Sequence, residues 1–569
     1  TKATANGTQA VGSTGDAHYT TSRALVIAAA RTAILVVPGS GSILGIALYS
    51  GAIYAARNAA DGLTAAIYKS SASGWTAVKA GLIAGGTWRL DVANFSGTAT
   101  SKSLFGCDGR NNPFWWDGTT YTHITGLWDS AATSTDSVAI GTGAKTFVLV
   151  EANRDYTAGD AVTVWDAATA ANWMAGTVTT WTSGTKTLVL NITSVGGSGT
   201  KTAWHVGMTD YSDKPYMLRE HKDHMMYAYP NGQLRTSDLG DPTTGAGASA
   251  SLFGLGDEIT NLLTLKSGNL AIYCANSIYL LTGSNQLDWV KEEYSASGGA
   301  TADTAIEVAG VGIHIDAGAI KSLQATQAYG NYETSSLSSE VGARLSALLP
   351  YLVACVGNKA KQQYRVYASN GDVLVMTVTT PNAVITPKDV SPTVCNYNHD
   401  IACVATGELS DGSEAHFFGT TDGYVMHERS GTSFDGQSIP YTMRLTYNSF
   451  GSPANKKRFR KLEFEISANG SVTFNYKQHF DNQDGFYASS ANTEATAEAE
   501  SGLWDVATWD EFVWASADQT SISQHVRVPA NVAGIGRSMS LTFSFSSDSA
   551  LPHTIHGILY HYTPLGMTR

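Results

Sequence analysis

The sequence is short of charge, of paired cysteines and of long apolar runs, and each shortage excludes a class of protein. Charged residues make up only 15% of the 569 positions, which does not suit a helical bundle or an α/β enzyme. The five cysteines are an odd number without a CxxC pair, so no disulfide scaffold is expected and folding in a reducing cytoplasm is the simpler interpretation. The apolar runs have the length of strands, so no membrane insertion is predicted.

The short motifs that carry well-known catalytic chemistry are also missing. There is no GxSxG, no HExxH, no Walker loop and no GxGxxG that opens a helix. We therefore expect no enzyme, with no catalytic residues, no cofactor and no resident metal ion. The formal net charge of −12 argues against binding of nucleic acid or of an anionic membrane over the whole surface.

Glycine and tight turns are abundant, and they are most regular in the stretch Lys214–Gly283. Short apolar runs such as His224–Tyr229 and Leu270–Cys274 are separated there by Asn-Gly or Gly-Asn turns, which need the positive φ angles that Gly and Asn tolerate. Successive hairpins of this kind are typical of β-propeller blades. The sequence predicts an all-β protein with a propeller-like ring of five to seven hairpin blades.

Changes in the pattern along the chain predict four kinds of segment. An extended arm covers residues 1–23, and the propeller covers 24–126 and 209–436. A small β domain, 127–208, is inserted into a propeller loop, because low charge and Gly-Thr-Lys turns set it apart from its flanks. Longer alternating strands predict a C-terminal β-sandwich over 437–569. One short helix is expected, at Glu340–Leu349.

Two clusters could carry binding chemistry or could serve packing. His221 and His224 form HxxH around a turn, which could hold a metal ion, although a solvated turn is the favoured interpretation. Phe114, Trp115 and Trp116 place rings on both faces of one strand. That pattern suits a strand packed between two blades, and a carbohydrate platform is the alternative.

The one basic cluster lies at the start of a predicted strand of the C-terminal sandwich. Its members are Lys456, Lys457, Arg458, Arg460 and Lys461. Such a cluster could contact DNA or an acidic partner. It could equally be a charged strand entrance that discourages pairing with other chains. We take it as a possible interface or DNA-facing site.

Three segments resemble proteins of one family. The text "LREHKDHMMYAYPNGQLRTSDLGDP", continuing to "LAIYCANSIYLLTG", resembles propeller-bearing tail nozzle or hub proteins of short-tailed bacteriophages. The segment "SVAIGTGAKTFVLV" to "GGSGTKTAWHVGM" looks like a small β module of phage tail and fibre proteins. The text "YTMRLTYNSFGSPANKKRFRKLEFEI" and the ending "RVPANVAGIGRSMSLTFSFSSDSALPHTIHGILYHYTPLGMTR" look like the C-terminal part of the same tail proteins.

The resemblance implies a structural protein of the virion tail, made in the host cytoplasm. It implies a homo-oligomeric ring, commonly of six copies, below the portal–adaptor complex, with tail fibres or spikes on its outer face and genomic DNA passing through its lumen. An acidic lumen would let DNA slide, because like charges repel. The alternative is a carbohydrate-binding or glycan-depolymerising tail protein that acts on the host surface.

Overall fold

The computed structural model describes most of the chain, and the architecture below refers to those residues. The positions outside the description are 1–34, 96, 98–100, 125–131, 152–153, 157, 160, 208–213, 246–249, 284–286, 297, 327–330, 381–384, 431–433, 435–437, 469–471, 482–492, 498–523, 548–552 and 566–569. The predicted N-terminal arm, residues 1–23, lies outside the described residues. The chain divides into two compact units, Ile34–Glu428 and a second that contains Arg429–Arg569.

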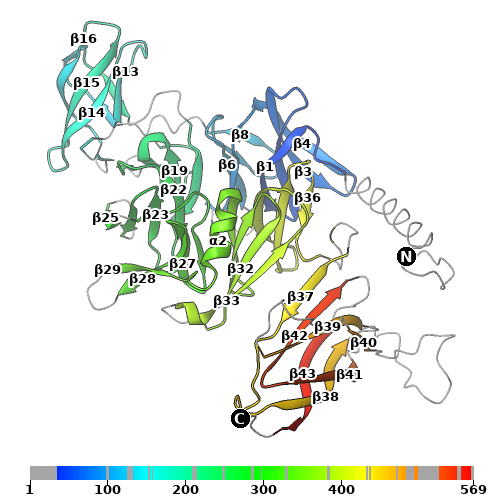
Figure 1. Cartoon of the computed structure of the whole chain (residues 1–569). Helices are drawn as coiled ribbons and strands as arrows, with labels where there is room; N and C mark the ends of the chain where they lie inside the picture. The colour runs from blue at the N-terminus through cyan, green and yellow to red at the C-terminus, as the bar shows by residue number, and fades with distance from the viewer. Residues whose placement is uncertain are drawn as a thin grey trace. The chain divides into compact units, whose positions relative to one another are not determined.

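The first unit holds seven antiparallel sheets of consecutive strands, which are the blades of a β-propeller (Figure 1). Blade 1 is β1 (Ser40–Tyr49), β2 (Ala52–Asn58), β3 (Thr64–Ser71) and β4 (Gly74–Ile83); blade 2 is β5 (Arg89–Ala93), β6 (Ser103–Cys107), β7 (Phe114–Trp116) and β8 (Tyr121–His123). Blade 3 is β18 (Met217–His221), β19 (His224–Tyr229), β20 (Gln233–Thr236) and β21 (Leu252–Gly254); blade 4 is β22 (Ile259–Thr264), β23 (Leu270–Cys274), β24 (Ile278–Thr282) and β25 (Val290–Ser295). Blade 5 is β26 (Ile306–Val308), β27 (Val311–Asp316), β28 (Ala319–Thr326) and β29 (Asn331–Ser336). Blade 6 is β30 (Leu352–Asn358), β31 (Gln363–Ala368), β32 (Asp372–Val378) and β33 (Val390–Asn396); blade 7 is β34 (Ile401–Glu408), β35 (Glu414–Thr420) and β36 (Val425–His427).

The ring closes without a covalent link between its first and last blades. Strand β1 packs against β34 and β35, and the apolar side chains of Ile46 and Leu48 meet Ala415 and Phe417 there. The backbone N–H of Val37 also donates to the carbonyl of Gly423 at 3.0 Å. Burial of this apolar surface holds blade 7 against blade 1, and similar clusters join each pair of neighbouring blades from blade 1 to blade 6.

A separate sheet interrupts the ring between blades 2 and 3. Its six strands are β9 (Ala132–Ser134), β11 (Gly143–Val148), β13 (Ala161–Asp166), β14 (Trp173–Thr182), β15 (Thr187–Gly196) and β17 (Trp204–Gly207). Two short pairs accompany it: β10 (Val138–Ala139) with β16 (Thr200–Lys201), and β12 (Arg154–Asp155) in parallel with β21 of blade 3. The sheet has its own core, in which Phe147 and Trp204 meet edge to face.

The second unit contains a β-sandwich. One sheet has the order β37 (Pro440–Arg444), β42 (Met539–Ser546), β39 (Val472–Phe480) and β40 (Thr493–Ala497). The other has the order β41 (Gln524–Gly536), β38 (Lys457–Ala468) and β43 (His553–Pro564). Phe464 packs edge to face on Phe474 and Phe543 of the facing sheet. Alternate residues of β38, namely Leu462, Phe464 and Ile466, face inward and form part of the sandwich core.

The all-β prediction with a propeller-like ring is confirmed, and several predicted strands coincide with observed ones. Strands β19 and β23 have the predicted bounds, and the predicted helix is α2 (Gly342–Leu348), followed by a 3₁₀ turn, η3 (Leu349–Tyr351), that contains Pro350. The other 3₁₀ turns are η2 (Pro230–Gly232) and η4 (Pro387–Asp389). None of the described helices is long enough, or apolar enough, to span a bilayer.

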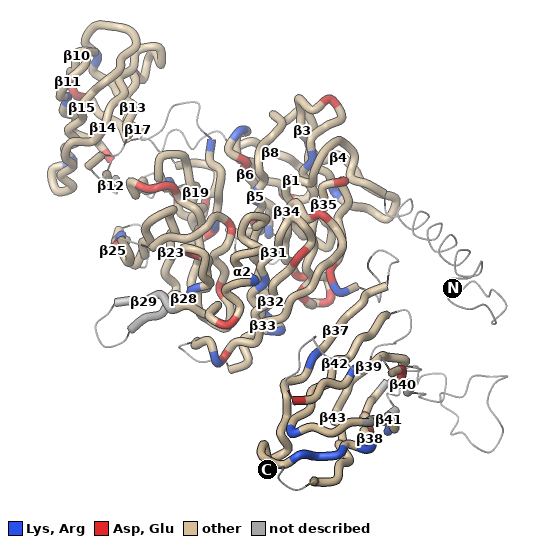
Figure 2. The backbone as a smooth tube through the Cα atoms, in the orientation of Figure 1, with Lys and Arg blue, Asp and Glu red and all other residues tan. Residues whose placement is uncertain are grey.

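The net charge is not shared evenly between the two units. From Ile34 to Glu428 the sequence has 22 Lys and Arg against 34 Asp and Glu, which accounts for the whole net charge of −12. The remaining residues carry equal numbers of the two signs. Figure 2 shows acidic positions on many propeller strands and loops, and a basic run along β38. The propeller unit is therefore acidic and the second unit is neutral overall.

Candidate functional site

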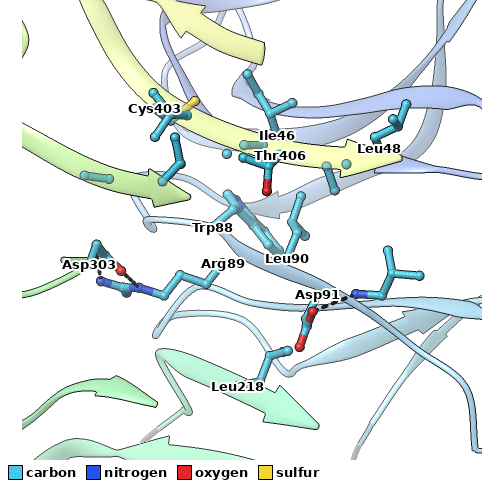
Figure 3. Close-up of a pocket in the computed structure, with 18 of the residues that line it drawn as sticks. Ile46, Leu48, Trp88, Arg89, Leu90, Asp91, Leu218, Asp303, Cys403 and Thr406 are labelled. Atoms are coloured by element: carbon cyan, nitrogen blue, oxygen red, sulfur yellow. Dashed lines mark hydrogen bonds and ion pairs between the residues drawn. The ribbon is translucent and has the colours of Figure 1, made fainter. Parts of the chain in front are cut away.

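The centre of the propeller is a cavity that the first strand of every blade lines. Its volume is about 970 Å³, and its wall includes residues of β1, β5, β18, β22, β30 and β34 and the segment that leads into β26. The first strand of each blade is thus the innermost one. Figure 3 shows apolar side chains, among them Ile46, Leu48 and Leu90, beside a small number of charged groups.

One ion pair joins blade 2 to the connection between blades 4 and 5 across this cavity. Arg89 Nε donates to Asp303 Oδ1 at 2.8 Å and Nη2 donates to Oδ2 at 2.7 Å, which makes the pair bidentate. Burial alone would lower the pKa of Arg89, but the hydrogen bonds and charge of Asp303 outweigh it and the pKa is raised. The blade 4–5 connection is two to three blades away from blade 2, so the pair joins parts of the ring that are not neighbours.

The backbone around Asp303 extends the brace to the neighbouring blades. Its N–H donates to the carbonyl of Thr260 in blade 4, and its carbonyl accepts the N–H of Cys355 in blade 6. The residue has a φ of 58°, in the left-handed region. Arg89 Nη1 donates to the carbonyl of Tyr216 just before blade 3. The ion pair and these backbone bonds therefore link blades 2, 4 and 6 and the connections that lead into blades 3 and 5.

A second ion pair lies in the cavity lining, between blades 2 and 3. Asp91 Oδ2 lies 3.7 Å from Arg219 Nη1 of blade 3, and Figure 3 shows Asp91 near Leu218. The thiol of Cys403 lies in the wall, where burial raises its pKa to about 12, so it stays protonated and unreactive at neutral pH. The cavity lining mixes polar and apolar groups, and its ion pairs join different blades.

Blades 6 and 7 meet around a buried carboxylate. Glu428 Oε1 accepts from Arg365 Nη1 at 2.7 Å, and the two side chains are 1% and 0% exposed. Tyr367 donates to Glu428 Oε2 at 2.5 Å, and the Tyr397 hydroxyl donates to Oε1. Burial first, and then the charge of Glu428, raises the pKa of both tyrosines, so both remain donors. Glu428 is the last residue of the propeller unit.

The predicted basic cluster does not act as one surface. Lys457 is only 2% exposed, and its ammonium donates to the carbonyls of Ser452, Asn455 and Arg537. It cannot face DNA or a partner there, because strand alternation turns it inward beside Phe459. This part of the prediction is corrected.

The remaining members of the cluster stay accessible to different degrees. Arg458, Arg460 and Lys461 are exposed on β38 and Lys456 is half-buried. Lys461 pairs with Glu463 at 2.7 Å. Both Arg460 and Lys461 are exposed because the register with β41 and β43 shifts between Phe459 and Lys461.

The residues singled out for binding chemistry serve packing instead. Phe114 and Trp116 are buried between blades 1 and 2, and the Trp116 indole N–H donates to the Tyr54 hydroxyl at 3.0 Å. His221 and His224 are buried beside Trp289, so the solvated turn expected for them is wrong. Among the described residues, no three His, Cys, Asp or Glu side chains gather as metal ligands.

Sequence reasoning did not single out Arg89, Asp303 or Glu428. The two ends of the brace are 214 positions apart in the chain, and Arg365 and Glu428 are 63 apart. Each is an ordinary charged residue next to a strand, so no local pattern distinguishes it. Only the closure of the ring brings the partners together.

No protein-family model matches the chain, and no curated protein matches it. One similar solved structure is described as BBS1N in complex with ARL6DN, soaked with lead; it has 12% identity and a TM-score of 0.25, with 70% of this chain and 95% of that chain covered. Another is Sqt1 from Saccharomyces cerevisiae, with 10% identity, a TM-score of 0.32 and coverage of 68% and 96%. These TM-scores are too low to carry an argument, and the fold stands on the strand pairings given above.

Proposed function

We propose that the chain is a structural component of a bacteriophage tail, a nozzle or hub subunit in a homo-oligomeric, commonly hexameric, ring below the portal–adaptor complex. The ring would form part of the conduit for genome ejection and a platform for tail fibres. The proposal rests on the resemblance of three segments to such tail proteins. It fits a chain in which two ion pairs join different blades at the propeller centre.

The observation that carries the proposal furthest is the braced centre of the propeller. A volume of about 970 Å³ is that of a small-molecule pocket, and the Arg89–Asp303 pair crosses it. A DNA duplex would therefore pass between copies of the chain and not through one propeller. The acidic surface of the propeller unit would suit such a lumen, because it repels the phosphate backbone and limits sticking.

Electron microscopy of the purified protein, alone and with portal–adaptor and fibre proteins, tests this function. We expect closed rings of several copies with an axial opening, and stacking of these rings on the adaptor. The same preparation should release no reducing sugar from host envelope polysaccharide. A monomer that degrades such a polysaccharide would overturn the proposal and favour the glycan-depolymerising alternative.

The structure removes one argument for that alternative. A carbohydrate platform would need Trp115 or Trp116 exposed beside a pair of carboxylates. Trp116 is 9% exposed and Trp115 packs beside the cluster shared by blades 2 and 3. Neither ring is presented as an open stacking surface.

A further inference from the structure

The tip of the first hairpin of blade 3 places two buried histidines side by side. His221 ends β18 and His224 begins β19, and the two are paired across the turn of Lys222 and Asp223. Paired residues of an antiparallel ladder point to the same face of the sheet, with Cβ atoms about 5 Å apart. His221 is 1% exposed and His224 is 0% exposed. Packing explains the position of their ring carbons, but each ring also carries two nitrogens that need partners.

One nitrogen of His224 is held by the backbone and the other is unpaired. Nδ1 lies 2.7 Å from the carbonyl oxygen of Ser237, and because a carbonyl can only accept, Nδ1 is the nitrogen that donates. Nε2 is buried and has no hydrogen-bond partner among the described residues. A ring whose one N–H is anchored on a backbone carbonyl, with the other nitrogen unpaired, has the arrangement of a metal-ligating histidine.

His221 adds a second imidazole without a partner. Both of its ring nitrogens are buried and unpaired within the part of the chain that the structure describes. Both imidazoles lie near the ring of Trp289, with centroids 6.4 Å away for His221 and 4.8 Å for His224. Buried polar groups are nearly always hydrogen-bonded, so unpaired nitrogens on two neighbouring rings require an explanation. A metal ion would accept a lone pair from each ring.

The surroundings of the pair contain sulfur but no anionic ligand. Met226 lies two positions after His224 on the same face of β19, in the apolar cluster on which Trp289 packs. Glu220 pairs with Met225 on the other face of the hairpin. No third His, Cys, Asp or Glu side chain joins the two histidines among the described residues. The ligands available on this face are therefore two imidazoles and a thioether.

We propose that His221 and His224 bind a Cu(I) ion, with the thioether of Met226 as the third ligand. Zinc in proteins is held by at least three Cys, His, Asp or Glu side chains, and only two are present here. Imidazole suits copper, and thioether ligands select Cu(I). A single positive charge also costs less to bury than a double one where no carboxylate neutralises it. The ion would tie β18 to β19 below their turn, and the site is independent of the tail function proposed above.

Competition for Cu(I) tests the site in the full-length chain. Thiols also bind Cu(I), so the parent protein carries Cys395→Ser and Cys403→Ser, which remove the two cysteines that are not fully buried. Cu(I) is offered without oxygen, with ascorbate, as its coloured bicinchoninate complex. We expect the parent to withdraw one Cu(I) per chain, measured as loss of the colour. The X-ray absorption spectrum of the bound copper should show imidazole scattering.

Two substitutions remove the proposed ligands with little change of shape. The amide N–H of His224→Asn can still donate to the carbonyl of Ser237, but this variant lacks Nε2. His221→Phe keeps a ring without nitrogens. Each should lower the affinity for Cu(I) about tenfold or more, since loss of even a residue that supports a ligand has such an effect. His314→Phe is the matched control and should leave the affinity unchanged. His314 is also fully buried with two unpaired nitrogens, but it pairs with Lys321 and not with a second histidine.

Three results would overturn the proposed copper site. The parent could withdraw no Cu(I) from the complex. The bound copper could show only sulfur ligands, which would place it on the remaining thiols. His221→Phe and His224→Asn could both bind Cu(I) as tightly as the parent does. Urea unfolding shows whether each variant is folded, and if one is not, the imidazole scattering of the parent decides. None of these results bears on ring assembly, which electron microscopy tests separately.

Discussion

The Glu428 carboxylate accepts hydrogen bonds from Arg365, Tyr367 and Tyr397 at the end of the propeller unit. The side chains of Glu428 and Arg365 are both buried. Removing one charge therefore leaves the other unpaired in a medium of low dielectric. We expect Glu428→Gln to lower the free energy of unfolding by about 3 kcal/mol, as for other broken buried pairs. Urea titration followed by tryptophan fluorescence measures the change.

An exposed ion pair of the same type is the control for Glu428. Arg344 and Asp372 are 3.2 Å apart, and the arginine side chain is 45% exposed. Water and salt screen such a pair, so Arg344→Met should change the free energy of unfolding by less than about 1 kcal/mol. Equal effects of the two substitutions would show that the buried carboxylate has no special weight.

Two buried histidines make stability depend on pH in one direction. Burial first, and then Lys222 and His224, lowers the pKa of His221 from 6.5 to about 4. Burial is also the main cause that lowers the pKa of His314 to about 4. The unfolded chain binds more protons than the folded one between these values, so stability is full above pH 6.5 and falls towards pH 4.

Replacing the imidazoles should flatten that dependence. Unfolding free energies measured from pH 7 to pH 4 should fall less steeply in His221→Phe and in His314→Phe than in the wild type. The two residues lie in blades 3 and 5, so their effects on the slope should add. An unchanged slope in both variants would contradict the buried neutral state of these rings.

Hairpins with Asn-Gly or Gly-Asn turns were predictable because their turn chemistry is local. Asn231 and Gly232 have φ values of 64° and 70°, as that chemistry requires, and β19 ends where expected. The outer strands were less predictable. Strand β25 reads VKEEYS and has no apolar alternation, because one side of it faces solvent. The alternation of apolar and polar residues therefore detects half-buried strands but not an edge strand such as β25.

Gly232 shows how tightly one such turn is packed. A Cβ atom there would lie 2.3 Å from the carbonyl oxygen of Asp257, in addition to the strain of a positive φ. We expect Gly232→Ala to destabilise the protein by about 2–3 kcal/mol, of which the left-handed backbone contributes about 1 kcal/mol. Thermal and urea unfolding measure this change in the free energy of unfolding.

Gly268 supplies the matched comparison for that turn. It has a φ of 80° with open space where a Cβ would go, so Gly268→Ala should cost only the backbone part, about 1 kcal/mol. If the two substitutions cost the same, the close approach of Asp257 is not a determinant of the turn.

At the scale of the whole molecule, the sequence indicates the blades but not the ion pairs that join them. Turn residues and strand periodicity are local, whereas the Arg89–Asp303 brace and the Arg365–Glu428 pair join residues that are far apart in the chain. The inward position of Lys457 follows from strand alternation and could have been predicted.

The ion pair between Arg365 of blade 6 and Glu428 after blade 7 predicts where the chain can be truncated without destabilising the propeller. Of two fragments that begin at Ile34, one ending at Gly431 keeps Glu428, and one ending at His427 loses both its carboxylate and its backbone N–H bond to the carbonyl of His416. The longer fragment should unfold at the temperature of the propeller in the intact chain. The shorter one should unfold several degrees lower, with faster amide exchange in β34–β36, because its Arg365 is left buried without a counter-charge. Differential scanning calorimetry and hydrogen exchange compare the two fragments.

A longer fragment that does not fold would contradict the independence of the propeller unit. Equal unfolding temperatures and exchange rates in the two fragments would contradict the role of Glu428 in holding blade 7 to blade 6.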